Sequence, residues 1–361
     1  MRRTAGSDLL ETDAAFAKPT HSEQVRPGGP SHRSRLAASH RRLRCAHDDR
    51  PTLIACSGRI DSSALALALA ATRQRFVIAH VVHDLRDAEN AEADRSLAES
   101  LARALDMRFV IAEVAVRSLP GNDEANARRA RYAELERLAR EHGCSYVATG
   151  HPGDDQLETM LMAMLRGAGP RGLSAMRPRR KLGDGKTILI RPMLGITRAD
   201  ADRICAQAGF EPAYDSTNGD TSRLRAQLRE TAVPMLLAAR SQSASRLGGL
   251  SRMLRGAAAV VRDAAIALDE SARTEATDDR RVYRRQSLAG ARRIVATDML
   301  RRARRQIVGK EGEGQLSQRM TDCVIDAIRD NNGAERRFAW QGVRITLDKS
   351  TVAVERSHPD A

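Results

Sequence analysis

Residues 53–62, Leu-Ile-Ala-Cys-Ser-Gly-Arg-Ile-Asp-Ser, decide the fold of this chain. An apolar run ends in a Ser-Gly turn, and the Ala/Leu-rich segment that follows is typical of a helix. A strand, a tight loop and a helix N-terminus hold phosphate well, because backbone amides and the helix dipole face the anion. Ser57 and Ser62 offer hydroxyl groups, Gly58 allows close approach, and Asp61 can bind magnesium. No G-x-x-x-x-G-K-[ST] pattern occurs, so this is not a Walker loop.

From Pro51 onward, apolar runs of strand length alternate with helix-forming segments. This alternation predicts βαβ units and a parallel sheet that binds its ligands at the carboxyl ends of the strands. The expected strands are Thr52–Cys56, Phe76–Val82, Phe109–Val114, Tyr146–Thr149 and Thr187–Ile190. The expected helices are Ser62–Ala71, Ala91–Leu105, Glu124–Glu141, Asp155–Leu165 and one that is capped by Thr197 and ends at Gly209.

The pattern divides the chain into three parts. Residues 1–46 are rich in Arg, Ser, Pro, Gly and His, which predicts a basic, disordered extension. Residues 47–238 are predicted to form a Rossmann-like α/β domain with a parallel sheet. Residues 239–361 are predicted to form a smaller, mostly helical domain, with short closing strands at Phe338–Trp340, Arg344–Leu347 and Val352–Val354.

The chain is strongly basic, with a net charge of +14 over 361 residues, which favours a polyanionic partner such as a nucleic acid. Because it has 55 Arg and only 5 Lys, a GC-rich coding bias is an alternative explanation. No apolar segment approaches the ~20 residues of a membrane span, and the N-terminus lacks a secretory signal. A cytoplasmic protein is therefore expected. The five cysteines form no C-x-x-C pair, which argues against zinc, iron–sulfur or disulfide sites.

A second polar block follows a predicted strand: His-Pro-Gly-Asp-Asp-Gln-Leu-Glu-Thr at residues 151–159. It places His151, Asp155 and Glu158 at i, i+4 and i+7, which is one face of a helix start. Acidic capping of a helix would explain the Asp-Asp pair alone. Because it does not explain three such side chains on one face beside a strand end, a metal-assisted or cation-binding site is an equal alternative.

Two further segments combine arginine with turn residues. Leu-Arg-Gly-Ala-Gly-Pro-Arg-Gly-Leu at 165–173 can present guanidinium groups to phosphate, or it can form a helix end and a solvated turn. Arg-Pro-Met-Leu at 191–194 precedes an Asp-Ser-Thr-Asn turn, and then come Arg223, Arg225 and Arg229. These three do not form a single helical stripe, so at least one is expected to be only solvated.

In this order and at this spacing, the blocks resemble those of the tRNA(Ile)-lysidine synthetase family of PP-loop ATP pyrophosphatases. The family motifs are S-G-G-x-D-S, H-x-x-D-D-Q-x-E-T, L-R-G-x-G-x-R-G-L, R-P-L-L and an S/T-N-x-D segment with arginines. Residues 80–86 resemble its H-V-D-H-G-L-R segment, and residues 124–132 resemble its E-A-x-x-R-x-x-R-Y helix. The resemblance covers roughly residues 50–240 and is loose beyond them, as expected of a short form.

The resemblance implies an enzyme that uses ATP and Mg²⁺ to adenylate the wobble cytidine of a CAU-anticodon tRNA(Ile). Free L-lysine would then displace AMP to give lysidine, and the family also suggests a homodimer. His151, Asp155 and Glu158 would lie at the reaction centre, and Arg223 or Arg225 would stabilise the developing phosphate charge. Asp61 would hold the metal, within an ATP-binding loop formed by Ser57, Gly58, Arg59, Ile60, Asp61 and Ser62.

Several positions depart from the family pattern. Arg59 replaces the second glycine of the loop, where it either adds a cation or blocks the phosphates. Smaller departures occur at Val82, Asp84, Ala175, Ala226 and Gln227. Because of these departures, a non-catalytic tRNA-binding relative remains an alternative interpretation. Another PP-loop tRNA-modifying enzyme is a second alternative, although sulfur insertion usually needs paired cysteines.

Overall fold

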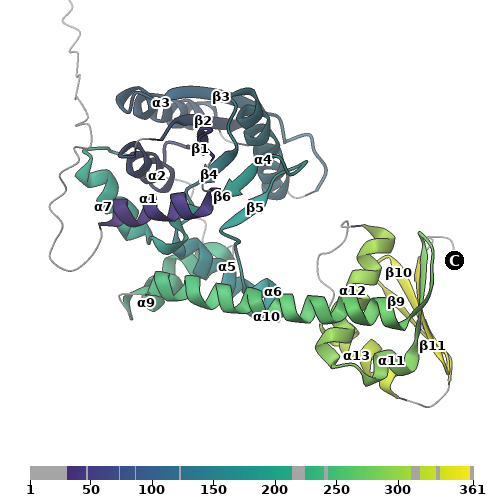
Figure 1. Ribbon diagram of the computed structural model, residues 1–361. Helices are drawn as coiled ribbons and strands as arrows, with labels where there is room; N and C mark the ends of the chain where they lie inside the picture. Colours follow the sequence, from purple (N-terminus) through teal and green to yellow (C-terminus); the bar gives the residue numbers. More distant parts are fainter. Residues whose placement is uncertain are drawn as a thin grey trace, which may run out of the picture. The chain divides into compact units, whose positions relative to one another are not determined.

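The computed structural model describes residues 31–45, 48–72, 74–85, 87–121, 123–213, 224–239, 243–309, 318–330 and 334–357. The chain forms two compact units (Figure 1). The first comprises Met1–Ala163 and Ala175–Leu250, and the second comprises Met164–Ser174 and Ser251–Ala361. The arginine-glycine segment at 165–173 therefore belongs to the second unit. In this unit Ser251 Oγ donates a hydrogen bond to the Ser174 carbonyl at 2.8 Å.

The first unit is built on a sheet that is parallel except at one edge. Strand β1 (Thr52–Ala55) lies between β2 (Phe76–His83) and β4 (Tyr146–Thr149) and runs parallel to both. The described strands follow the order β3-β2-β1-β4-β6-β5, with β3 at Arg108–Val114 and β6 at Ile188–Ile190. Strand β5 (Arg179–Lys181) pairs antiparallel with β6. The predicted α/β fold class is therefore confirmed, and all five expected strands form.

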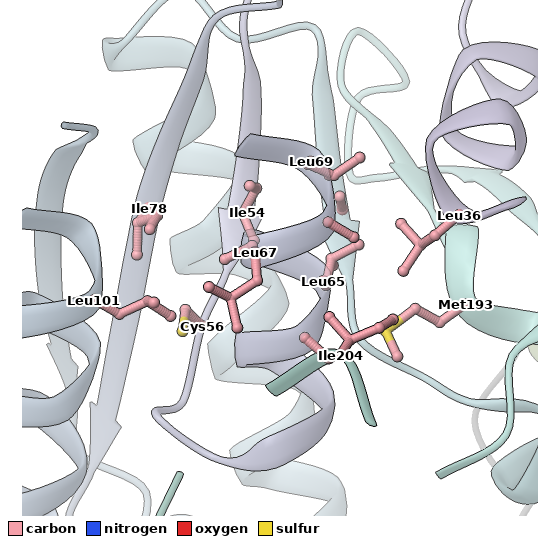
Figure 2. Close-up of a cluster of buried hydrophobic side chains, with 14 of the residues drawn as sticks. Leu36, Ile54, Cys56, Leu65, Leu67, Leu69, Ile78, Leu101, Met193 and Ile204 are labelled. Carbon is pink, nitrogen blue, oxygen red and sulfur yellow. The ribbon is translucent and has the colours of Figure 1, made fainter. Parts of the chain in front are cut away.

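Successive residues of the central strands point to opposite faces of the sheet and supply two separate cores. Ile54 and Ile78 pack against one helical layer, which includes α2 (Ile60–Ala70), α3 (Ala88–Ala104) and α7 (Arg198–Gln207) (Figure 2). Leu53 and Val77 face the opposite core, which contains Leu135 and Leu138 of α4 (Asp123–Glu141). Because both faces are covered, the strands read as continuous apolar runs in the sequence.

Part of the expected disordered extension is helical: residues 32–43 form α1 (His32–Leu43), whereas residues 1–30 lie outside the described residues. It contacts α2 and α7, and its Leu36 is fully buried in the core that contains Ile54. The remaining buried positions of the helix are polar, Arg33 and His40, so the segment has almost no apolar periodicity. A helix whose fully buried apolar contact is a single leucine, with Leu43 only partly buried, gives a weak sequence signal.

The burial of His40 predicts an acid-sensitive first unit. Its Nε2 lies 3.2 Å from Thr52 Oγ1, and its ring packs on Phe76. Burial, together with Arg44 and Arg41, lowers the pKa of His40 to about 4. Between pH 6.5 and 4, His40 is therefore protonated in the unfolded chain but stays neutral in the folded chain. The free energy of unfolding falls as the pH falls through this range. At pH 4.5 the burial of this neutral histidine should lower the free energy of unfolding by about 2 kcal/mol relative to pH 7.

Urea denaturation of the wild type and of His40→Gln at pH 7 and pH 4.5 measures this contribution. The wild type should lose more stability on acidification than the variant, by about 2 kcal/mol. Equal losses in the two proteins would show that His40 is not the group responsible.

The second unit contains an antiparallel sheet covered by helices. The described strands follow the order β7 (Arg273–Ala276), β8 (Arg280–Arg284), β11 (Thr351–Arg356), β10 (Val343–Leu347) and β9 (Arg336–Trp340). Its core joins this sheet to α11 (Arg285–Gly290), α12 (Arg293–Val308) and α13 (Gln318–Arg329). The three expected closing strands are confirmed. Strands β7 and β8 were not expected, because arginine fills most of β8 and three of the four residues of β7 are polar.

A buried arginine ties the two layers of the second unit together. Arg285 lies at the start of α11 and donates hydrogen bonds to the Ile328 carbonyl at 3.0 Å and the Ala327 carbonyl at 2.7 Å, at the end of α13. It also donates to the Asp348 carbonyl at 2.6 Å, in the turn between β10 and β11. These bonds satisfy helix-terminal carbonyls that otherwise have no partner within the helix.

The remaining described elements are helical. They are α5 (Gly153–Leu165), α6 (Pro170–Leu173), η1 (Pro192–Gly195), α8 (Leu224–Gln227), η3 (Leu228–Ala232), α9 (Val233–Ala238) and α10 (Ser243–Ala272). Helix α7 has the expected cap, since Thr197 and Asp200 form a capping box. Among the described residues, none of the helices combines the length and apolar character required to cross a bilayer.

Candidate active site

The candidate site lies where the strand order reverses. Strands β2 and β4 flank β1, and ligands of such sheets bind outside the strand ends at this point. A cavity of about 1350 Å³ opens there in the first unit. Side chains from three predicted motifs line it, namely Ser57, Arg59, Asp61, Ser62, His151, Asp155 and Arg225.

The loop between β1 and α2 is held by its own hydroxyl groups. Ser62 Oγ accepts a hydrogen bond from the Ser57 amide at 3.0 Å and donates one to the Arg59 carbonyl at 2.9 Å. The Ser57 and Ser62 hydroxyls also lie 3.2 Å apart. These internal hydrogen bonds fix the conformation of the loop at the N-terminus of α2, where backbone amides favour the binding of an anion.

Two glycines permit close backbone approaches at this loop. Gly58 has a φ of +75°, and a Cβ atom there would lie 2.6 Å from the Asp94 carbonyl oxygen of α3. Gly150 follows β4, and a Cβ atom there would lie 2.7 Å from the Asp61 carbonyl oxygen. Gly150 thus lets the end of β4 touch the first turn of α2, which brings the second predicted block against the loop.

Carboxylates and arginines form a network of ion pairs at the cavity and behind its wall. Asp155 Oδ1 lies 3.2 Å from Arg198 and 3.4 Å from Arg229. Arg198 also reaches Asp61 Oδ2 at 3.5 Å. Glu158 is fully buried and binds Arg229 at 2.8 Å and Arg225 at 3.0 Å. The carboxylates of two separate motifs are therefore linked through arginines from two further segments.

Burial and neighbouring charges move the pKa values of the carboxyl groups apart. Burial raises the pKa of Asp61 to about 6; Arg198 opposes this change, and Asp155 and Asp154 reinforce it. Burial and then Glu158 raise the pKa of Asp155. Burial also acts on Glu158, but Arg229 and Arg225 outweigh it and lower its pKa. Glu158 is therefore the carboxylate that stays ionised most firmly.

His151 is a neutral hydrogen-bonding group in this environment. Burial, followed by the charges of Arg191 and Arg128, lowers its pKa to about 3. Its Nδ1 lies 2.8 Å from the hydroxyl of Thr149, at the end of β4. A neutral imidazole at this place can position a substrate group, but it adds no positive charge at neutral pH.

The donor set fits a magnesium ion that is shared with phosphate. The Asp61 Oδ1 atom is buried and has no hydrogen-bond partner in the described part of the chain. The nearby charges of Asp155 and Asp154, which raise its pKa, would also be offset by a cation. No cluster of three or more His, Cys, Asp or Glu side chains suited to a metal occurs among the described residues. Magnesium usually binds through one or two carboxylates plus substrate phosphates, so this set fits.

The sequence of this chain is also similar to the sequences of known proteins. The family model for the PP-loop domain matches residues 33–236. The chain is 38% identical over 248 residues to the tRNA(Ile)-lysidine synthase of Salinispora tropica, which covers 66% of this chain and 72% of that protein. The chain belongs to the tRNA(Ile)-lysidine synthase family.

Other relatives extend this result. The tRNA(Ile)-lysidine synthase of Symbiobacterium thermophilum is 32% identical over 328 residues, covering 85% of this chain and 65% of that protein. Among solved structures, the U34-tRNA thiolase of Methanococcus maripaludis superposes with a TM-score of 0.50 at 16% identity. That match covers 62% of this chain and 78% of the thiolase, and it supports the fold alone.

The structure brings together most of the residues that the sequence singled out. Glu158 lies behind the cavity wall, fully buried under its two arginines. Arg225 contacts Glu158, whereas Arg223 lies outside the described residues. Sequence reasoning missed Arg198, which occupies the first position of α7. A cation at a helix N-terminus opposes the helix dipole, and this misplaced charge was the available signal.

Proposed function

We propose that this protein attaches lysine to the wobble cytidine of a tRNA(Ile) with a CAU anticodon, in an ATP-dependent reaction that forms lysidine. The observation that carries the proposal is a cavity in which the loop between β1 and α2 meets Asp155 and three arginines, Arg198, Arg225 and Arg229. The membership in the tRNA(Ile)-lysidine synthase family supports the substrate and the reaction.

In the proposed first step, the 2-oxo oxygen of the cytidine attacks the α-phosphorus of ATP, and pyrophosphate leaves. The loop from Ser57 to Ser62 would bind the phosphates through its amides and the N-terminus of α2. Magnesium, held by Asp61, would neutralise phosphate charge. Arg198, Arg225 or Arg229 would stabilise the charge that develops on the phosphate, since all three already bind carboxylates at this site.

In the proposed second step, an amine of lysine attacks C2 of the adenylated cytidine, and AMP leaves with the oxygen. The attacking amine must lose its proton. Asp155 suits this task because its carboxylate lines the cavity and burial raises its pKa. Glu158, which remains ionised behind the cavity wall, would hold Arg225 and Arg229 in position beside the reacting groups.

Purified protein incubated with ATP, magnesium, labelled lysine and the isoleucine tRNA transcript tests the proposal. Label should enter the tRNA and should be absent when the wobble cytidine is replaced by uridine. Absence of label from the cytidine transcript, with tRNA binding intact, would refute the reaction and favour a non-catalytic tRNA-binding relative or a different amine substrate.

The basic helix α12 of the second unit is the expected tRNA contact. Replacing Arg301, Arg302 and Arg305 with glutamine should weaken tRNA binding and reduce the slope of log K against log salt by about 2 to 3, because each phosphate contact releases counterions. Arg304 is left in place because it is buried and donates to the Gln341 carbonyl at 2.8 Å. A filter-binding titration at several salt concentrations measures this slope.

A matched triple variant on the first unit, Arg103, Arg137 and Arg140 to glutamine, provides the control, because all three side chains are exposed. If both triple variants keep the wild-type slope, the arginines of α12 make no phosphate contacts.

A further inference from the structure

We propose that Arg59, at the position where the family has glycine, binds the pyrophosphate portion of ATP, and that Asp94 positions its side chain for this. The inference rests on the proposed use of ATP by this cavity and adds a residue that is particular to this chain. Arg59 would then be an added phosphate ligand, and its presence in the motif would not indicate a loss of activity.

The backbone accepts arginine at this position without strain. Arg59 has a φ of −86° and a ψ of 163°, an extended conformation that any residue adopts. Its neighbour Gly58 differs, since the φ of +75° and the carbonyl of Asp94 exclude a side chain there. The main chain on both sides is also fixed, because the Ala213 amide donates to the Gly58 carbonyl at 3.2 Å. Of the two glycines in the family motif, the conformation of this loop therefore requires only the first, which is Gly58 here.

The arginine side chain is held beside the cavity and does not fill the loop. Its Nε lies 3.8 Å from Oδ2 of Asp94, which is buried on α3. About a third of the Arg59 side chain, 32%, remains exposed, and both residues line the cavity. A guanidinium group at the surface of a cavity can donate charge-assisted hydrogen bonds to a phosphate that binds there.

The surrounding charges favour an anion next to Arg59. Arg128 and Arg131 of α4 line the same cavity, and Arg59 lies near enough to Arg131 for their positive charges to repel each other. A polyphosphate bound between them would replace this repulsion by attraction. The carboxylates of Asp61 and Asp87 also line the cavity, which suits a phosphate that arrives with a divalent cation.

The order of the strands places Arg59 on the side of the site where the pyrophosphate leaving group of ATP would lie. Asp94 lies on α3, which follows β2, whereas Asp155 lies on α5, which follows β4. Strands β2 and β4 flank β1 on opposite sides. If the α-phosphorus reacts beside Asp155, the β- and γ-phosphates extend across the end of β1 towards Arg59.

Calorimetric titration of the full-length protein with magnesium pyrophosphate, ATP and AMP tests this inference. Arg59→Ala and Arg59→Gly should each weaken binding of pyrophosphate and ATP by about tenfold, as expected for loss of a charge-assisted hydrogen bond. AMP binding should not change. Arg59→Lys should retain part of the affinity, and Asp94→Asn should weaken binding less than Arg59→Ala because the guanidinium remains.

Arg103→Ala is the matched control, since Arg103 is an exposed arginine on α3 that pairs with Glu99. Unchanged or tighter pyrophosphate binding in both Arg59→Ala and Arg59→Gly would overturn the inference. The labelled-lysine reaction separates this result from the proposed function. Weakened pyrophosphate binding in a protein that never modifies tRNA would support Arg59 and refute lysidine formation, whereas normal modification with unchanged pyrophosphate binding would refute the role of Arg59 alone.

Discussion

Replacement of Asp155 by alanine should lower the rate of lysidine formation by about a thousandfold, the scale expected for loss of a general base. The variant removes the carboxylate that lines the cavity and leaves Arg198 and Arg229 without one of their anionic partners. Because the basic surface of the second unit is untouched, tRNA binding should persist. Single-turnover incorporation of labelled lysine and filter binding measure the two properties separately.

Asp155→Asn sharpens this test, since it preserves the shape of the side chain and removes its charge and basicity. It should be nearly as inactive as the alanine variant. Glu141→Ala serves as a control, because Glu141 is an exposed carboxylate on α4 that pairs only with Arg137 among the ion pairs of the described residues. Near-normal turnover in Asp155→Ala would refute the assignment of this site.

Gly150→Ala should weaken ATP binding and slow the reaction by about a hundredfold, although the change adds only one methyl group. The new Cβ would lie 2.7 Å from the Asp61 carbonyl oxygen and 2.9 Å from the Ser62 amide nitrogen. Both are backbone atoms, so the phosphate loop and the end of β4 must separate. A displacement of about 1 Å in a reacting site is sufficient for an effect of this size.

Gly195→Ala is the matched control in the same unit, since no heavy atom lies within 4 Å of the Cβ position there. It should bind ATP like the wild type. If Gly150→Ala also binds and reacts normally, contact between β4 and the loop does not determine the geometry of the site.

The first unit could be predicted well because its strands are buried on both faces. Thr52–Ala55 and Tyr146–Thr149 appear as short apolar runs, and the intervening segments have the length and composition of helices. The elements that were missed have the opposite character. Strand β5 consists of Arg-Arg-Lys, and β8 is mostly arginine, so neither shows the apolar alternation on which strand prediction depends.

The site was predictable to the level of motifs but not of contacts. The spacing of His151, Asp155 and Glu158 predicted one helix face, but only Asp155 and Glu158 lie on α5, and His151 lies before it, after β4. The sequence could not show that Glu158 would be fully buried beneath Arg225 and Arg229, because those residues lie 67 and 71 positions away. Likewise, the pairing of Arg59 with Asp94 depends on how α3 packs against the loop.

Helix α1 also sets the order in which this protein can fold during synthesis. Arg33 donates a hydrogen bond to the carbonyl of Ile204, a partner 171 residues later in the chain. At a translation rate of about 5–20 residues per second, this helix waits roughly 10–30 s for α7 to leave the ribosome. Because α1 contains few apolar residues, the nascent segment exposes little apolar surface in this interval. Although α1 precedes the other described helices in the chain, it can pack fully against its unit only after α7 has been synthesised.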